Sequence, residues 1–90
     1  MLERLRVWLQ MRRRRKAAIR QALKKFYELR GVSPINGHVL RVDSHETIVR
    51  VMYFTNHVPP ERAWFAVPVD GREIRELLFD DVRGLESPWR

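Results

Sequence analysis

The apolar positions in residues 2–30 recur every three or four residues, which is the spacing of an amphipathic α-helix. They fall into two stripes at the same helical phase. The first stripe consists of Leu2, Leu5 and Leu9, with Trp8 beside it, and the second consists of Ile19, Ala22, Leu23 and Phe26. The segment contains no glycine or proline, whereas Gly31 and Pro34 follow soon after it. The pattern therefore predicts one helix that ends near residue 30.

Cations interrupt the apolar face between the two stripes. The positions that would continue it are Arg12, Arg15 and Lys16. We therefore predict that residues 17–90 form a single domain on which the second half of the helix docks. Residues 1–16 are predicted to be a basic amphipathic extension that projects beyond this domain or bends away. Because a free helix of about 15 residues is only marginally stable in water, we expect the extension to become ordered on a partner.

After Gly31 the pattern changes to β-branched and alternating residues, which is typical of strands. The predicted strands are residues 39–42, 47–55 and 63–69. Asn36 and Gly37 are predicted to form a turn before the first strand, and Asp43–His45 a hairpin turn after it. The double proline at 59–60 predicts a loop before the third strand.

The segment after residue 70 fits two patterns. Asp70 followed by Gly71 is a hairpin signal, which favours a fourth strand over Arg72–Phe79. Asp70 and Glu73 also have the spacing of a helix capping box, and the apolar residues that follow keep helical spacing. We favour the strand and keep the helix as the alternative.

Together these elements predict an α+β fold. A long basic N-terminal helix packs on a three- to four-stranded antiparallel β-meander. The predicted core consists of Ile19, Leu23, Phe26, Val49, Val51, Phe65, Val67 and Leu77.

Length and composition limit the classes of protein. Ninety residues make one small domain, which buries only about 60% of its unfolded surface and is marginally stable. The chain has no cysteine, which excludes disulfides and cysteine-based zinc sites and fits a reducing compartment. No run of about 20 apolar residues and no secretory signal is present. We therefore expect a cytoplasmic protein.

The charge is distributed unevenly along the chain. Residues 1–31 contain eleven Lys or Arg and two acids, a net charge of +9, whereas the remaining residues have a net charge of −2. A basic segment on a nearly neutral body indicates an anionic partner. Successive helical residues turn by about 100°, so five adjacent cations suit a groove lined by phosphates better than a flat surface.

We therefore expect non-catalytic binding of nucleic acid by phosphate neutralisation, with RNA ahead of DNA. The expected contact residues are Arg12, Arg13, Arg14, Arg15, Lys16, Arg20 and Lys24. A protein-interaction module or accessory subunit, dimeric or docked on an acidic partner or an anionic membrane, is the alternative. The leucines and Trp8 beside the cations are the residues that an interfacial helix requires. The plainest interpretation is a solvated basic face, or one paired with the acids of the body.

Aromatic side chains on the strands provide a second candidate surface. Tyr53 and Phe54 lie on one predicted strand and Trp64 and Phe65 on the next. If one face of the sheet packs on the helix, rings on the other face could stack on unpaired bases. The candidates for stacking are Tyr53 and Trp64.

No combination of residues indicates catalysis or a metal site. His38, His45 and His57 do not have the spacing of metal ligands, and Asp80 and Asp81 lack a third ligand nearby in sequence. A small ribonuclease would need an acid–base pair, and none is evident. We expect no cofactor, no metal and no small-molecule substrate.

Overall fold

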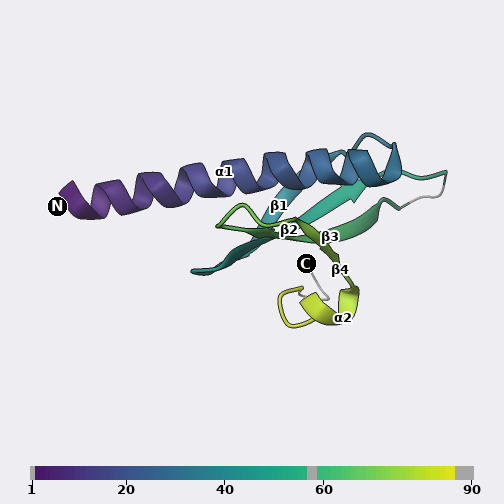
Figure 1. Cartoon of the computed structure of the whole chain (residues 1–90). Helices are drawn as coiled ribbons and strands as arrows, with labels where there is room; N and C mark the ends of the chain where they lie inside the picture. The colour runs from purple at the N-terminus through teal and green to yellow at the C-terminus, as the bar shows by residue number, and fades with distance from the viewer. Residues whose placement is uncertain (1, 57–58, 87–90) are drawn as a thin grey trace.

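The computed structural model describes residues 2–56 and 59–86 and confirms the α+β class. The elements are α1 (Leu2–Arg30), β1 (Asn36–Val42), β2 (Glu46–Tyr53), β3 (Glu61–Pro68), β4 (Arg75–Leu77) and α2 (Phe79–Val82). The strands form one antiparallel sheet in the order β1-β2-β3-β4. Helix α1 lies on one face of this sheet, and α2 lies on the opposite face (Figure 1).

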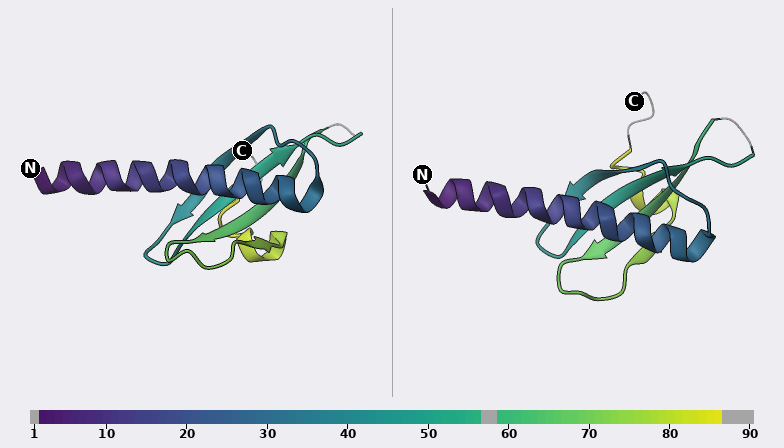
Figure 2. Two further views of the ribbon diagram at one scale, coloured as in Figure 1. Left: turned by 45° about the horizontal axis from the view of Figure 1, so that its top comes forward. Right: turned by 90° about the horizontal axis from the view of Figure 1, so that it is seen from above.

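Helix α1 is continuous through the basic run. It has 29 residues, so it is about 43 Å long at 1.5 Å per residue. Only its C-terminal half lies over the sheet, and the N-terminal half projects past the strand ends (Figure 2). Among the described side chains of α1, the first buried one from the N-terminus is that of Ala18. Gly31 ends the helix with a φ of 66°, and its N–H donates to the carbonyl oxygen of Tyr27 at 2.8 Å.

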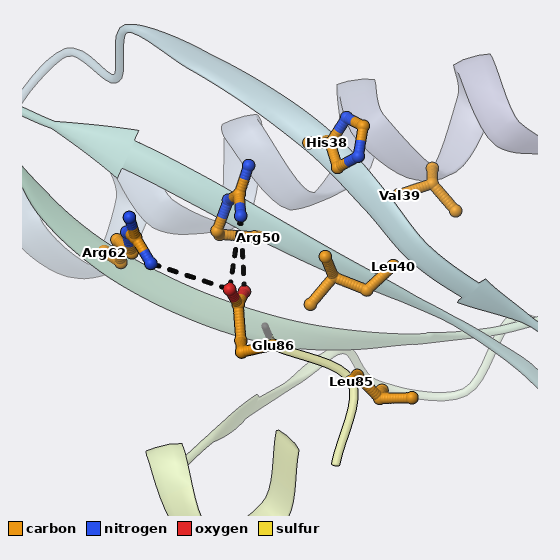
Figure 3. A pocket seen from close by; sticks show the side chains of 7 residues that line it. All are labelled: His38, Val39, Leu40, Arg50, Arg62, Leu85 and Glu86. Carbon is orange, nitrogen blue, oxygen red and sulfur yellow. Dashed lines mark hydrogen bonds and ion pairs between the residues drawn. The ribbon is translucent and has the colours of Figure 1, made fainter. Parts of the chain in front are cut away.

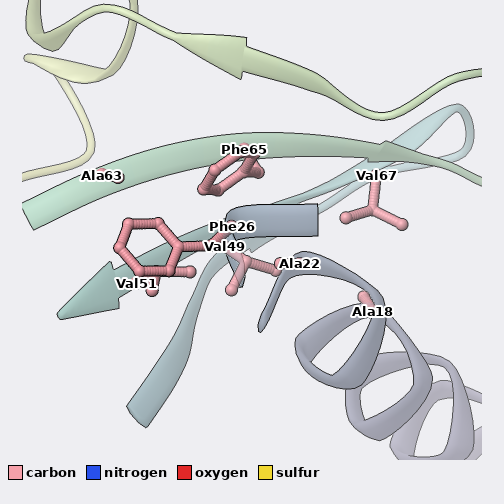
Figure 4. Close-up of a cluster of buried hydrophobic side chains, with 8 residues drawn as sticks. All are labelled: Ala18, Ala22, Phe26, Val49, Val51, Ala63, Phe65 and Val67. Carbon is pink, nitrogen blue, oxygen red and sulfur yellow. The ribbon is translucent and has the colours of Figure 1, made fainter. Parts of the chain in front are cut away.

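The main core lies between α1 and the sheet. Figure 4 shows its eight buried residues, which are Ala18, Ala22, Phe26, Val49, Val51, Ala63, Phe65 and Val67. The Phe26 ring is fully buried, 4.6 Å from the Tyr53 ring and 6.5 Å from the Phe65 ring between centroids. The predicted core residues Phe26, Val49, Val51, Phe65 and Val67 are therefore confirmed, while Ile19 and Leu23 pack against this core and are partly buried.

A smaller core lies on the other face of the sheet. Its buried residues are Ile48, Ala66 and Val82. Leu77 packs here and is only partly buried, so its expected place in a single core with α1 was wrong. Because the chain returns under the sheet through α2, part of the second face also has an apolar cover from the same chain.

Two local predictions around β1 had different outcomes. Asn36 and Gly37 do not form a turn, because they pair with Met52 and Val51 as the first residues of β1. A Cβ on Gly37 would lie 2.9 Å from Cγ2 of Ile19, so glycine lets this strand approach α1 closely. The hairpin turn at Asp43–His45 is confirmed: Asp43 Oδ1 accepts hydrogen bonds from the backbone N–H groups of His45 and Glu46, both at 2.8 Å.

The segment after residue 70 contains both of the alternatives that its pattern allowed. Arg75–Leu77 forms the fourth strand, which is shorter than the expected Arg72–Phe79, and α2 follows directly. The capping box of Asp70 and Glu73 does not form, since Asp70 Oδ1 accepts from the N–H of Arg72 instead. The helix starts later, where Asp81 Oδ2 accepts from the N–H of Leu78 at 2.8 Å.

A bidentate ion pair ties the end of α1 to β4. Arg30 donates from Nη1 and Nη2 to the two carboxylate oxygens of Glu76, at 2.7 and 2.6 Å. These hydrogen bonds lower the pKa of the Glu76 carboxyl below its usual value. The Arg30 guanidinium also lies 5.5 Å from the centre of the Phe26 ring, which joins the pair to the main core.

We expect the Arg30–Glu76 pair to make stability depend on pH in acid. The pKa of Glu76 is lower in the folded state than in the unfolded state, where it is about 4.3. The contribution of the ion pair to stability is therefore complete above about pH 4.3, and it is lost as the pH falls through the folded-state pKa. Urea unfolding should show that Glu76→Gln costs roughly 0.5–1 kcal/mol at pH 7 and less at pH 3. Glu28→Gln, an exposed carboxylate on the same helix, is the control. An equal cost of Glu76→Gln at both pH values would contradict the assignment.

Candidate functional site

The basic run lies where α1 leaves the sheet. Arg12, Arg13, Arg15 and Lys16 are exposed, while Arg14 is half-buried. From the helical repeat, Arg15 lies on the same side as the buried Ala22, and Arg13 lies on the opposite side. The five side chains therefore surround the helix axis.

Helix α1 also carries a basic row on the face turned away from the sheet. Its members are Arg6, Arg13, Arg20 and Lys24, and all four are exposed. Successive members are seven or four residues apart, so steps of about 10.5 and 6 Å separate them along the axis. Arg20 and Lys24 lie on the half of α1 that packs on the sheet, so the position of this end of the row relative to the sheet is fixed. Arg6 was not among the expected contact residues, although its spacing of seven to Arg13 and Arg20 was a signal for it.

The cations of the extension have no acidic partner among the residues whose side chains the structure describes. Among the described side chains, the ion pairs on α1 lie near its C-terminal end, from Lys25 to Glu73 and from Arg30 to Glu76. Most acids of the body are paired with arginines of the body. These pairs are Asp43–Arg41, Glu46–Arg41, Glu46–Arg75, Asp70–Arg72, Asp80–Arg83, Glu86–Arg50 and Glu86–Arg62. In the described part of the chain, the basic run thus forms no ion pairs with the acids of the body.

Arg14 differs from its neighbours because it contacts the body. It lines a small hollow together with Ala18 of α1 and Thr47, Val67 and Val69 of the sheet end. Its Nε and Nη2 atoms are buried and have no hydrogen-bond partner in the structure. This side chain therefore marks the point at which the helix begins to pack on the sheet.

Apolar side chains are exposed among these cations. Leu5, Val7 and Trp8 are each 54% exposed. Leu9 and Met11 are also exposed. The Arg12 guanidinium lies 5.5 Å from the centre of the Trp8 ring. The projecting half of α1 thus combines positive charge with a large uncovered apolar area.

Tyr53 and Trp64 do not form a common stacking surface. Val49, Val51 and Tyr53 alternate onto the face under α1, whereas Arg50 and its partner Trp64 point to the opposite face. The Tyr53 ring packs on Phe26. The Trp64 ring lies 5.6 Å from that of Phe79, and its Nε1–H donates to Glu86 Oε1 at 2.9 Å.

The remaining polar candidates lie apart from one another. His38 is on β1 and His45 is in the turn after it, while His57 lies outside the described residues. The hydrogen bonds from the N–H groups of Glu46 and His45 lower the pKa of Asp43, so that carboxylate caps a turn. Across residues 2–56 and 59–86 there is no group of three His, Cys, Asp or Glu that could hold a metal ion.

Comparison with known proteins adds no family to this description, because no family model, no curated protein sequence and no solved structure matches the chain. Neither described helix combines the length and the apolar character needed to cross a bilayer.

Proposed function

We propose that the protein binds nucleic acid through α1 without catalysing a reaction. The observation that carries the proposal is the set of exposed cations on the projecting half of α1, which have no carboxylate partner among the described side chains. Like charges held this closely repel one another, and a polyanion relieves that repulsion. Each neutralised phosphate also releases counterions, which makes the affinity independent of sequence and sensitive to salt.

The arrangement of the cations favours a groove or a flexible strand over a flat anionic surface. Arg13 and Arg15 lie on opposite sides of the helix, so both contact phosphates only if the polymer wraps around it. RNA is the first polymer to test, because arginine binds phosphate in a bidentate manner and also stacks on unpaired bases. Tyr53 and Trp64 have no part in this proposal.

The test is a titration of the protein with single-stranded RNA and with a DNA duplex over a range of salt concentrations. We expect log affinity to fall linearly with log salt, by about 0.7 per phosphate contact on a single strand and about 0.9 on a duplex. Binding to neither polymer at low salt would contradict the proposal. Stronger binding to the DNA duplex than to the single-stranded RNA would indicate that DNA is the polymer that the protein binds.

The exposed apolar residues favour a second candidate, an interaction module that docks on an anionic membrane surface or an acidic partner. Leu5, Trp8 and Leu9 would enter the interface while the cations contact its anionic groups. Vesicles with anionic lipids distinguish the two functions, since membrane binding shifts tryptophan emission to the blue. That shift should be lost in Trp8→Ala if the helix enters the bilayer surface.

A further inference from the structure

A second cluster of cations lies on the opposite side of the molecule from α1. Strand pairing places His38, Arg50 and Trp64 in one row across β1, β2 and β3, on the face turned away from α1. Arg62 follows in the next row, paired with Met52. The C-terminal segment covers only one end of this face, where Val82 and Leu85 pack on Ile48 and Ala66. Among the described residues, this apolar cluster does not extend to the end of the face that carries Arg50 and Arg62.

In the part of the chain that the structure describes, one carboxylate contacts both arginines. Glu86 accepts hydrogen bonds from Arg50 Nη1, at 3.2 and 3.5 Å, and from Trp64 Nε1 at 2.9 Å. Arg62 Nη1 lies 3.5 Å from the same group. The Glu86 side chain is 6% exposed, so this anion is almost fully removed from water. Figure 3 shows dashed contacts from the Glu86 carboxylate to both guanidinium groups.

The two guanidinium groups are not saturated by this carboxylate. Both of its contacts with Arg50 use Nη1, and the buried Nε of Arg50 has no partner in the structure. The Arg62 side chain is 41% exposed and makes one long contact. Counted over the described side chains, two guanidinium charges against one carboxylate leave a net positive charge. The contacts of Glu86 with the two arginines are 3.2–3.5 Å long. Charge-assisted hydrogen bonds are normally shorter, about 2.7–2.9 Å.

A hollow lies beside these groups. Its lining includes His38, Leu40, Arg50, Arg62, Leu85 and Glu86, and its volume is about 360 Å³. Liquid water takes about 30 Å³ per molecule, so the hollow has room for a tetrahedral anion together with several waters. In Figure 3 the Arg50, Arg62 and His38 side chains lie around the same space as Glu86.

We propose that Arg50, Arg62 and His38 bind a phosphate group in this hollow, in competition with the Glu86 carboxylate. A phosphate has enough oxygens to bridge two guanidinium groups, each of which can bind it in a bidentate manner. The Glu86 carboxylate supplies only two oxygens and occupies the phosphate position in the free protein. Entry of phosphate releases Glu86 and with it the hydrogen bond from Trp64. This site is separate from α1 and does not depend on the function proposed for that helix.

The test follows the indole N–H signal of Trp64 by NMR in the whole protein, with Trp64→Phe to assign the signal. Inorganic phosphate should shift it in a saturable manner. In Glu86→Gln the affinity for phosphate should rise by about 10-fold, because the internal competitor is weakened. In Arg62→Gln it should fall by about 10-fold. Glu76→Gln changes the total charge by the same amount at the distant Arg30 pair, and it should leave the affinity unchanged.

A second titration identifies the source of the phosphate group. It uses a short single-stranded RNA and the variant in which Arg12, Arg13, Arg15 and Lys16 are Gln, so that contacts of α1 contribute less. A Trp64 shift with RNA supports the site for polymer phosphates, and a shift with inorganic phosphate alone supports it for small phosphates. No saturable shift with either probe would overturn the proposal, as would equal gains in Glu86→Gln and Glu76→Gln. If Glu86→Gln does not fold, an unchanged affinity in Arg62→Gln overturns it.

Discussion

Replacing Arg12, Arg13, Arg15 and Lys16 with Gln is expected to weaken binding to single-stranded RNA by several hundred-fold near 0.1 M salt. Each phosphate contact contributes about 0.7 to the slope of log affinity against log salt, so four contacts contribute a slope of about 2.8. Between 1 M and 0.1 M salt, this slope raises the affinity by about 2.8 logarithmic units. The slope itself should become shallower by the same 2.8 or so. Binding measured by fluorescence anisotropy at several salt concentrations gives both quantities.

The choice of these four residues follows from the structure. All four are exposed, whereas Arg14 is half-buried against the end of the sheet and is left unchanged. Glutamine has nearly the same helix propensity as arginine and lysine, so α1 should be retained. Circular dichroism of the variant checks that the helix content is unaltered.

The matched control removes four cations from the body. Arg41, Arg72, Arg75 and Arg83 are exposed, and each is paired with a carboxylate of the body. Changing these four to Gln lowers the formal charge by the same amount but should change the affinity for RNA far less. Equal losses in the two variants would mean that net charge alone attracts RNA, and would contradict a binding surface on α1.

Phe26→Ala is expected to lower the free energy of unfolding by about 3–5 kcal/mol. The Phe26 ring is 0% exposed and contacts aromatic rings on both β2 and β3. Its removal leaves a cavity between the helix and the sheet that the small Ala18 and Ala22 cannot fill. Since small domains have a total stability of about 5–15 kcal/mol, this loss is a large fraction of the whole.

Urea unfolding followed by circular dichroism measures the effect, and Tyr27→Ala is its control. Tyr27 is the next residue on the same helix, and its side chain is 55% exposed. The control should change stability by no more than about 0.5 kcal/mol. Comparable losses in the two variants would show that α1 is held on the sheet by something other than the contacts of Phe26.

The sequence was sufficient for those elements in which local and tertiary preferences agree. Residues 2–30 are good helix formers followed by glycine, and β2 and β3 are rich in β-branched and aromatic residues. The start of β1 was missed because Gly37 has the local signature of a turn, while its role is to let the strand approach Ile19. The segment after Asp70 was divided between strand and helix because pairing with β3 stops at Leu77.

The two candidate sites also differ in how far the sequence predicts them. The cations on α1 are adjacent in the sequence, so their number and their place on a helix follow from the sequence alone. Whether they are paired depends on where the carboxylates of the body lie, and that is a matter of tertiary structure. The cluster of Arg50, Arg62 and Glu86 joins residues up to 36 positions apart. No local pattern indicates it.

The amino-acid sequence by itself thus determined the α+β class, the long basic helix and most of the main core, because these depend on periodicity and composition. Only the tertiary structure decided that Tyr53 and Trp64 lie on opposite faces, that α2 covers the second face, and that Glu86 meets two arginines. The physical reason is that strand register and chain return set long-range contacts. A shift of one residue in register would exchange the two faces of the sheet.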